Sequence, residues 1–334
     1  MIRTRDLALA AALAGLAALV PLFVQRAPLL DLAVLTGYYL LLVGSWNLLA
    51  GFTGQFSFAH MGLAAVGGYG SALLAGGLGV PVGLTYPLAG LMAAGIGLVL
   101  GLVSLRVRGV QLPLITFAFA GAFGVWLTGA DEITGGARGL STQRLFSGVE
   151  HTPYVWVALA VVTLYFLLQW AILRSRWGLF LTTVRDNEWV AEGLGVRTFR
   201  VKLAVFAYTA FWAGLAGSFY ASYVGIIAPS MLHLSEMALV VAMAVVGGMG
   251  RALGPLVGVI LLRLLDHYVR GVGEQYTLLI TAGVTLAVVL FARGDLIGLV
   301  ERAVVRFLPR RERWAAARVS ETTRVRPRTS GERG

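Results

Sequence analysis

The sequence predicts an all-α integral membrane protein with about ten transmembrane helices, and three features of its composition carry this prediction. Hydrophobic residues make up 58% of the 334 residues and charged residues only 13%, whereas a soluble domain is about one quarter charged and needs that charge to cover its surface. The hydrophobic residues lie in runs of about 20, the length at which a helix spans a bilayer. The 43 glycines suit helices that pack with their backbones close together in lipid.

Ten apolar segments follow one another along the chain. We expect helices at about 7–24, 29–50, 61–79, 84–104, 110–129, 153–172, 202–226, 234–249, 253–269 and 275–292. The first segment follows a basic start, as a signal peptide does. It has 18 residues and leads directly into the second, so we interpret it as an uncleaved helix. Glycines interrupt the third and eighth segments, which makes these two the weakest helix predictions.

The distribution of basic residues predicts that both termini are cytoplasmic. An inner N-terminus places twelve Lys and Arg residues on the inner side and four on the outer side, as the positive-inside rule requires. Residues 301–334 contain ten further arginines, and we expect a disordered cytoplasmic tail that lies against anionic lipid and binds no nucleic acid. Residues 1–300 form one expected transmembrane domain, because no linker divides them.

The sequence offers little for covalent chemistry. It has no cysteine, and its four histidines show no metal-ligand spacing, so we expect neither a metal site nor a catalytic residue. Its single lysine, Lys202, does not belong to a phosphate-binding loop, and the H-E-x-x-H and G-x-S-x-G motifs are absent. We therefore expect no cofactor in this chain.

The stretch GFTGQFSFAHMG, residues 51–62, places polar residues between the second and third apolar segments. The predicted topology puts it at the cytoplasmic side, where its glycines allow a turn or a broken helix. The exposed backbone of such a break needs polar partners, which Thr53, Gln55, Ser57 and His60 can supply. Two interpretations stay open: a structural turn, or a re-entrant element whose Gln55, Ser57 and His60 line an inner path or gate.

The connection at 174–200 is longer than a simple cytoplasmic turn. We expect a short helix from Thr183 to Leu194, with Thr183 as its cap and Gly195 at its end. Its acids would lie one turn apart and its apolar residues on a different face: Glu188 and Glu192, and Val190 and Leu194. Such a helix suits docking into a groove of a partner. The alternative is a solvated helix at the lipid surface.

Ionisable residues inside the apolar segments are few. Asp31 lies about one turn inside the outer end of the second segment, and Arg263 and Asp266 lie near the outer end of the ninth. Residues three apart share a helical face, so we expect Arg263 and Asp266 to form a local ion pair, with a gating role as the alternative. We expect no acid at mid-membrane, which disfavours an ion-driven carrier.

Four stretches, in order, resemble segments of the LivM-type permeases, which are membrane subunits of branched-chain amino-acid ATP-binding-cassette importers. The stretches are GFTGQFSFAHMG, ITGGARGL, RDNEWVAEGLGVRTFRVKLAVFAYTAFWAGLAGSFYA and VVGGMGRALGPLVGVILL. The resemblance extends from about residue 37 to residue 298. It implies an importer permease bundle in the bacterial inner membrane.

The resemblance also implies partners. The 174–200 loop would be the segment that couples to a cytoplasmic ATPase, through Arg185, Asp186, Glu188, Ala191, Glu192, Leu194 and Gly195. A homologous permease subunit would complete a heterodimer, two ATPase subunits would hold ATP and magnesium, and a periplasmic binding protein would deliver branched-chain amino acids. Urea, short amides, or aromatic and other carboxylic acids are alternative cargoes for the same machinery. A single-chain secondary carrier is a more distant alternative.

Overall fold

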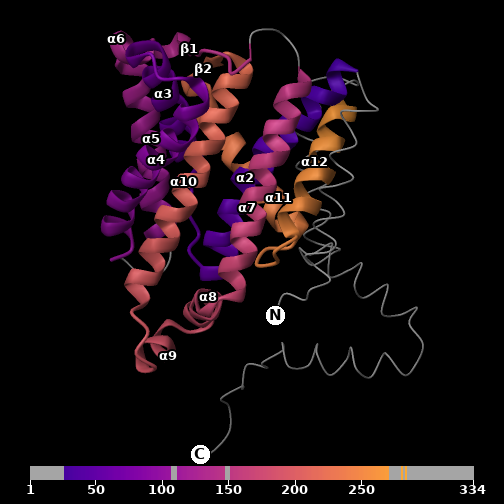
Figure 1. The fold of residues 1–334 in the computed structure, drawn as a ribbon. Helices are drawn as coiled ribbons and strands as arrows, with labels where there is room; N and C mark the ends of the chain where they lie inside the picture. The colour runs from indigo at the N-terminus through magenta and orange to yellow at the C-terminus, as the bar shows by residue number, and fades with distance from the viewer. Residues whose placement is uncertain (1–25, 107–110, 147–150, 271–279, 281–282, 284–334) are drawn as a thin grey trace, which may run out of the picture.

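A computed structural model describes residues 26–106, 111–146, 151–270, 280 and 283, and these residues form a bundle of long helices (Figure 1). The first predicted helix, nearly all of the tenth and the basic tail lie outside the described residues. Within the described part, the all-α prediction is confirmed, since the two strands have only two residues each.

Eight described helices correspond, in order, to the second to ninth predicted segments. Six are long and apolar enough to cross a membrane: α2 (Ala27–Thr53), α3 (His60–Leu78), α4 (Val82–Ser104), α5 (Gln111–Gly129), α7 (His151–Arg174) and α10 (Thr198–Val224). Two are shorter: α11 (Leu234–Gly247) and α12 (Gly254–Arg270). The glycine-interrupted third and eighth segments do form helices, α3 and α11, because packing outweighs the weak helix propensity of glycine in the interior of a bundle.

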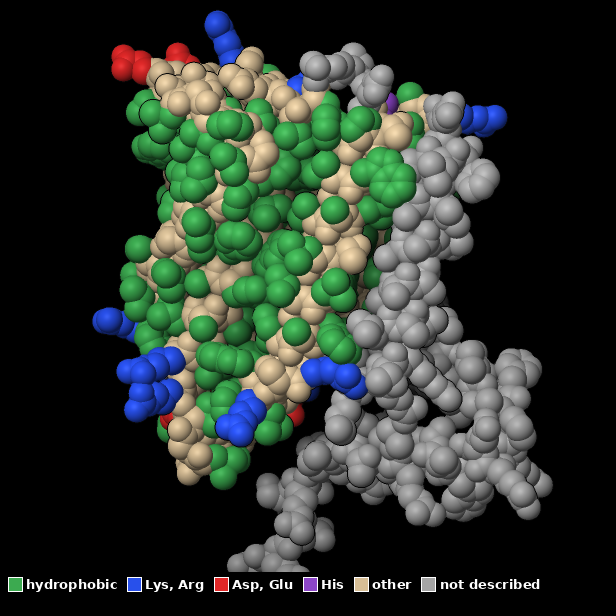
Figure 2. Space-filling model, viewed as in Figure 1, with side chains coloured by type: hydrophobic (Ala, Val, Ile, Leu, Met, Phe, Trp, Pro, Cys, Tyr) green, Lys and Arg blue, Asp and Glu red, His purple; other side chains and the backbone are tan. Residues whose placement is uncertain are grey.

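Short elements cover the two ends of the bundle (Figure 1). One end holds α6 (Asp131–Thr134), η1 (Gly136–Arg138), β1 (Leu140–Ser141), β2 (Ile226–Ile227) and η2 (Pro229–Leu232). The other holds α8 (Arg176–Asp186) and α9 (Glu188–Gly193). Figure 2 shows hydrophobic side chains over the surface between the ends, with basic side chains gathered near α8 and α9. We call the α8–α9 end inner and the opposite end outer, in agreement with the positive-inside rule.

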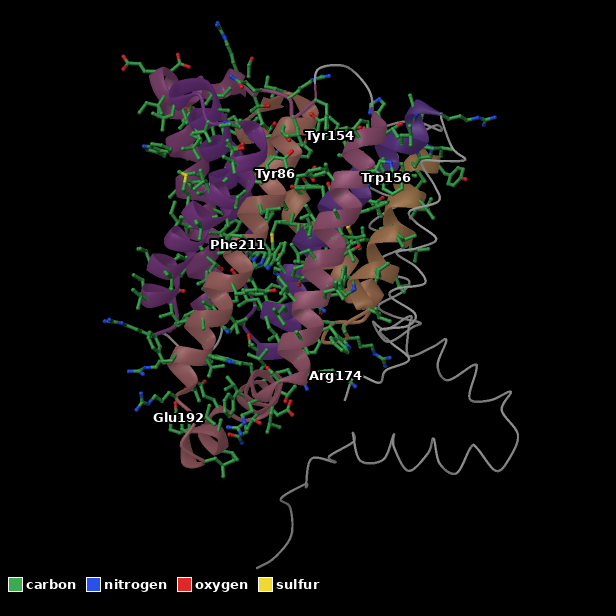
Figure 3. The ribbon with its side chains drawn as sticks, in the orientation of Figure 1. Tyr86, Tyr154, Trp156, Arg174, Glu192 and Phe211 are labelled. Atoms are coloured by element: carbon green, nitrogen blue, oxygen red, sulfur yellow. The ribbon has the colours of Figure 1, made fainter. Side chains whose placement is uncertain are left out.

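A glycine-rich turn closes the outer end. Leu140 of β1 pairs antiparallel with Ile227 of β2, so the segment after α5 meets the segment after α10. Gly139 precedes this pair with φ 76°, and a Cβ on it would lie 2.1 Å from the carbonyl oxygen of Ile227. Only glycine fits there. Nearby, the hydroxyl of Tyr154 in α7 donates a hydrogen bond to the carbonyl oxygen of Ser222 in α10 at 2.9 Å (Figure 3). The hydroxyl of Tyr86 in α4 forms a hydrogen bond with the hydroxyl of Ser222 at 2.6 Å.

Helix α10 packs against α3 and α4 with the backbones in contact. A Cβ on Gly217 would lie 1.8 Å from the carbonyl oxygen of Ala64, and one on Gly67 would lie 1.9 Å from that of Gly214. No side chain separates α10 from α3 at these points. In lipid, where apolar surface gives no drive for helices to associate, such close contact supplies the dispersion energy that holds them together.

Glycines also mark the packing faces of two other helix pairs. A Cβ added at Gly97 of α4 would lie 2.5 Å from the Cβ of Ala210. A Cβ added at Gly258 of α12 would lie 1.8 Å from the carbonyl oxygen of Met243. The first pair joins α4 to α10, and the second joins α12 to α11.

We predict that Gly217→Ala lowers the stability of the folded bundle by about 1–3 kcal/mol, because the added methyl group overlaps the α3 backbone. Gly95→Ala in α4 is the matched control, since a Cβ there meets nothing within 4 Å, and it should leave stability unchanged or raise it by up to about 1 kcal/mol. Unfolding in detergent by heat or denaturant measures both. Equal stability of the two variants would refute the packing role of Gly217.

Candidate functional site at the inner end

The chain breaks its helical course between α2 and α3 and turns back into the bundle. Gly54 ends α2 in the left-handed conformation, with φ 72°, and α3 begins only at His60. The indole Nε1 of Trp46 donates to the carbonyl oxygen of Ser57 at 2.8 Å. Trp46 lies seven residues before the end of α2, so Ser57 has risen about 10 Å from the inner end. Helix α3 therefore starts inside the bundle rather than at its inner end.

Polar side chains satisfy the backbone of this break. The hydroxyl of Ser57 accepts from the N–H of Ala59 at 3.2 Å, and the hydroxyl of Thr116 in α5 accepts from the N–H of Phe58 at 3.0 Å. The sequence predicts such partners within the polar stretch, and Ser57 is one of them. The partner from α5 was missed, because no local pattern reveals which distant helix faces a break.

The three residues proposed to line a path or gate lie inside the subunit. Gln55 is 2% exposed, and Ser57 and His60 are 0% exposed. The bonds of Ser57 agree with the structural-turn interpretation. Gln55 Oε1 and both ring nitrogens of His60 have no hydrogen-bond partner among the described residues. A role for Gln55 and His60 in a path therefore stays a prediction.

The inner loop forms two helices, so the expected single helix from Thr183 to Leu194 is wrong. Helix α8 ends at Asp186, and Asn187 separates it from α9. Thr183 is no cap, since it lies inside α8 and its hydroxyl bonds back to a carbonyl one turn earlier. Ser175 caps α8, and Asn187 caps α9 by accepting from the N–H of Val190 at 3.1 Å. Asparagine bonds readily to local backbone, which favours a cap over a helix interior.

Several of the expected coupling residues hold α9 in place. Glu188 forms a 2.6 Å ion pair with Lys202, and Glu192 accepts from the hydroxyl of Thr198 at 2.8 Å. Both partners belong to the start of α10, and Figure 3 places Glu192 at the inner end. Ala191 is 0% exposed. Together these contacts fix α9 against α10.

Exposed apolar side chains lie on α9 and on the residue after it. Val190 is 53% exposed and Leu194 is 74% exposed, as the predicted apolar face required. Gly195 follows with φ 84°, which lets the chain turn sharply towards α10. Asp186 is exposed beside Arg185.

Arg185 reaches from α8 into the bundle. Its Nη1 donates to the carbonyl oxygen of Gly51 at 3.1 Å, while its Nε donates to Asp186 at 2.9 Å. Gly51 lies in the last turn of α2, where carbonyl groups lack helical partners and a positive charge is favourable. Arg185 therefore ties α8 to the inner end of α2.

The turn between α11 and α12 meets the same end of α2. Asn47 Nδ2 donates to the carbonyl oxygen of Arg251 at 2.9 Å, and Asn47 Oδ1 accepts from the N–H of Gly250 at 2.8 Å. A Cβ on Gly51 would lie 2.3 Å from the nitrogen of Gly250, so the backbones touch. We call Asn47, Gly51, Arg185, Gly250 and Arg251 the inner joint. It brings together three motifs that lie far apart in the sequence.

A separate polar group lies deeper in the bundle. The predicted pair of Arg263 and Asp266 is confirmed, with an N–O distance of 2.7 Å, and both residues are buried. The guanidinium of Arg263 also lies 5.2 Å from the centre of the Tyr39 ring. The Tyr39 hydroxyl donates to Glu236 Oε2 at 3.0 Å. Tyr39 lies twelve residues before Gly51 on α2, so this group is about 18 Å above the inner joint.

Two acids, Glu236 and Asp266, belong to this group deep in the bundle, and their depth weighs against the expectation of no acid at mid-membrane. After α10 ends at Val224, β2 and the 3-10 helix η2 intervene before α11 begins at Leu234, and this run leads back into the bundle. The sequence held a signal for this, because the apolar segment expected at 234–249 would form a helix of only about 24 Å, short of a core of about 30 Å.

Comparison with known proteins agrees with this architecture. The family described as "Branched-chain amino acid transport system / permease component" matches residues 28–290. The high-affinity branched-chain amino acid transport system permease protein LivM of Escherichia coli K12 is 30% identical over 309 residues, covering 84% of this chain and 72% of the relative. LivM of Salmonella typhimurium is 30% identical over 300 residues, covering 81% and 70%.

A more distant relative carries a different name. The autoinducer 2 import system permease protein LsrC of Yersinia pseudotuberculosis is 28% identical over 205 residues, covering 57% of this chain and 56% of the relative. No solved structure matches the chain. The family match over most of the chain, the apolar spans and the helical bundle agree with one another: the chain belongs to the branched-chain amino acid transport system permease family and is a multi-pass membrane subunit of an ATP-binding-cassette transporter, not an enzyme.

Proposed function

We propose that the chain and a homologous second permease subunit form the membrane path of an importer for branched-chain amino acids in the bacterial inner membrane. Two cytoplasmic ATPase subunits hold ATP and magnesium, and a periplasmic binding protein delivers the cargo. The names of both LivM relatives support this cargo. The coupling proposal rests on two features of the inner loop. Its apolar side chains Val190 and Leu194 are exposed, and its Arg185 forms a hydrogen bond with the carbonyl oxygen of Gly51 at the end of α2.

The apolar surface suits an ATPase partner. Val190 and Leu194 are more than half exposed at the inner end, beyond the hydrophobic band where lipid would cover them. Exposed apolar side chains on a short, fixed helix are typical of a docking element that inserts into a groove. We therefore assign ATPase contact to Val190, Leu194 and the adjacent Gly195 and Asp186.

The other coupling residues transmit the movement. Glu188, Glu192 and Ala191 fix α9 to the start of α10, so the docking surface cannot shift without that helix. Arg185 bonds to Gly51 at the end of α2. Closure of the ATPase subunits on ATP thus moves α10 and α2 together, and the inner joint carries the movement to α11 and α12. Displacement of packed helices in this way is an established form of switching between two access states.

A polar path is needed because an amino acid carries two opposite charges, and transfer of an isolated charge into hydrocarbon is prohibitively costly. The chain itself performs no chemistry on the cargo. Its part is to provide polar groups in the membrane and to expose them to one side at a time.

We predict that Val190→Ser with Leu194→Ser weakens association with the ATPase subunits at least tenfold, since burial of each apolar side chain contributes about 1.5–3 kcal/mol. Copurification of the ATPase with the permease measures this. Leu78→Ser is the control, because Leu78 is 75% exposed at the outer end and should leave association unchanged. Full association of the double variant would exclude this surface as the docking site.

We predict that Arg185→Gln leaves the complex assembled but lowers the amount of cargo moved per ATP hydrolysed by about tenfold. The variant loses a hydrogen bond from a charged donor, which contributes about 1.5–3 kcal/mol to the tie between α8 and α2. Parallel assays of uptake and phosphate release in proteoliposomes give the ratio. Arg176→Gln, on the same helix and exposed, is the control. An unchanged ratio for Arg185→Gln would contradict the transmission role.

The cargo is tested with the complete importer in proteoliposomes. We expect radiolabelled leucine, isoleucine and valine to accumulate only when the binding protein and ATP are both present. Accumulation of urea or an aromatic carboxylate in place of leucine would contradict the cargo assignment. Uptake driven by an ion gradient without ATP would contradict the importer itself and indicate a secondary carrier.

A further inference from the structure

Glu236 lies close to the middle of the membrane by two independent measures. Along α2, its partner Tyr39 is twelve residues, or about 18 Å, from Gly51 at the inner joint. Along α11, Glu236 is eleven residues from Gly247, the inner end of that helix, or about 16 Å. The hydrocarbon core is about 30 Å thick. The two helices therefore agree that the carboxylate sits near half depth.

Glu236 has no ion-pair partner in the described part of the chain. Its one hydrogen bond comes from the neutral hydroxyl of Tyr39. The nearby guanidinium of Arg263 is directed at Asp266, at 2.7 Å. An ionised carboxylate in hydrocarbon is costly and marks a substrate or ion pathway by default. Because Glu236 is also partly exposed on the subunit, its open side must face a polar space rather than lipid.

The side chains around Glu236 suit a cation. Tyr38, Tyr39 and Tyr220 form a cluster, with the ring of Tyr38 at 5.0 Å from that of Tyr39 and at 4.8 Å from that of Tyr220. Aromatic faces attract ammonium groups, more strongly where water is excluded. A carboxylate beside an aromatic cluster therefore offers an ammonium group both a counter-charge and a cation–π surface.

We propose that Glu236, held by Tyr39, is the subsite that binds the ammonium group of an amino acid in transit through the membrane. This inference rests on the proposed function, because it names the group of the cargo that this chain recognises. It gives the subunit its own selectivity, separate from that of the binding protein. Amino acids carry the ammonium group, whereas urea, amides and simple carboxylic acids do not.

A purely structural role makes a different prediction. If Glu236 served only to tie α11 to α2 through Tyr39, Glu236→Gln would preserve the tie, since the amide oxygen still accepts from the hydroxyl. Tyr39→Phe would break it. For an ammonium subsite the order reverses, because Glu236→Gln removes the charge while Tyr39→Phe keeps both the charge and an aromatic face.

The experiment measures ATP-driven uptake of radiolabelled leucine by the complete importer in proteoliposomes, with the concentration of loaded binding protein varied. For Glu236→Gln we expect a maximal rate at least about tenfold lower, the scale of a lost hydrogen bond between charged groups, with an unchanged half-saturating concentration of binding protein. Glu236→Asp should recover part of the rate, and Tyr39→Phe should lose less than Glu236→Gln. Glu132→Gln, at an exposed outer position, is the charge-loss control.

The outcomes separate this inference from the function on which it rests. If the wild-type importer takes up no leucine, the cargo assignment fails. If it does and Glu236→Gln matches it, or if Tyr39→Phe is the more damaging variant, the ammonium subsite is overturned. A loss that appears only as a raised half-saturating concentration would assign Glu236 to docking of the binding protein and would also overturn it.

Discussion

The bundle depends on supplying partners to backbone groups wherever a helix breaks at membrane depth. A continuous transmembrane helix satisfies its own backbone, but a break exposes N–H and C=O groups that lipid cannot solvate. Between α2 and α3 these partners are Ser57, Thr116 and the indole of Trp46. At the α11–α12 turn the partner is the side chain of Asn47. The polar residues of this apolar protein are concentrated where its backbone needs them.

The breaks also create the features that function requires. Because the chain re-enters the bundle before α11, the third residue of that helix lies near half depth, and a glutamate there meets tyrosines from α2 and α10. Because α2 stops at Thr53, its last carbonyl groups remain open to a donor from α8. Helix α2 is common to both sites, so one rigid element connects the coupling loop to the middle of the membrane.

The sequence predicts the order of the apolar helices in the described residues well, because apolar length is a direct consequence of bilayer thickness. It also predicts the Arg263–Asp266 pair, since residues three apart on a helix must be neighbours. It fails where depth or long-range contact decides. The helix break at Asn187 depends on the competition between two possible caps. The depth of Glu236 and the bond from Arg185 to Gly51 depend on segments more than a hundred residues away. No local periodicity contains that information.

The bond from Arg185 ends on a backbone carbonyl, not on a side chain. Every amino acid supplies that carbonyl, so no substitution at position 51 can delete the acceptor. At position 51 only the size of the side chain is constrained, since a Cβ there would overlap the backbone of Gly250. Only a substitution of Arg185 removes a side chain that makes this hydrogen bond. Two related permeases can therefore both keep the bond without a paired substitution in α2. A search for covarying residues would accordingly miss the contact.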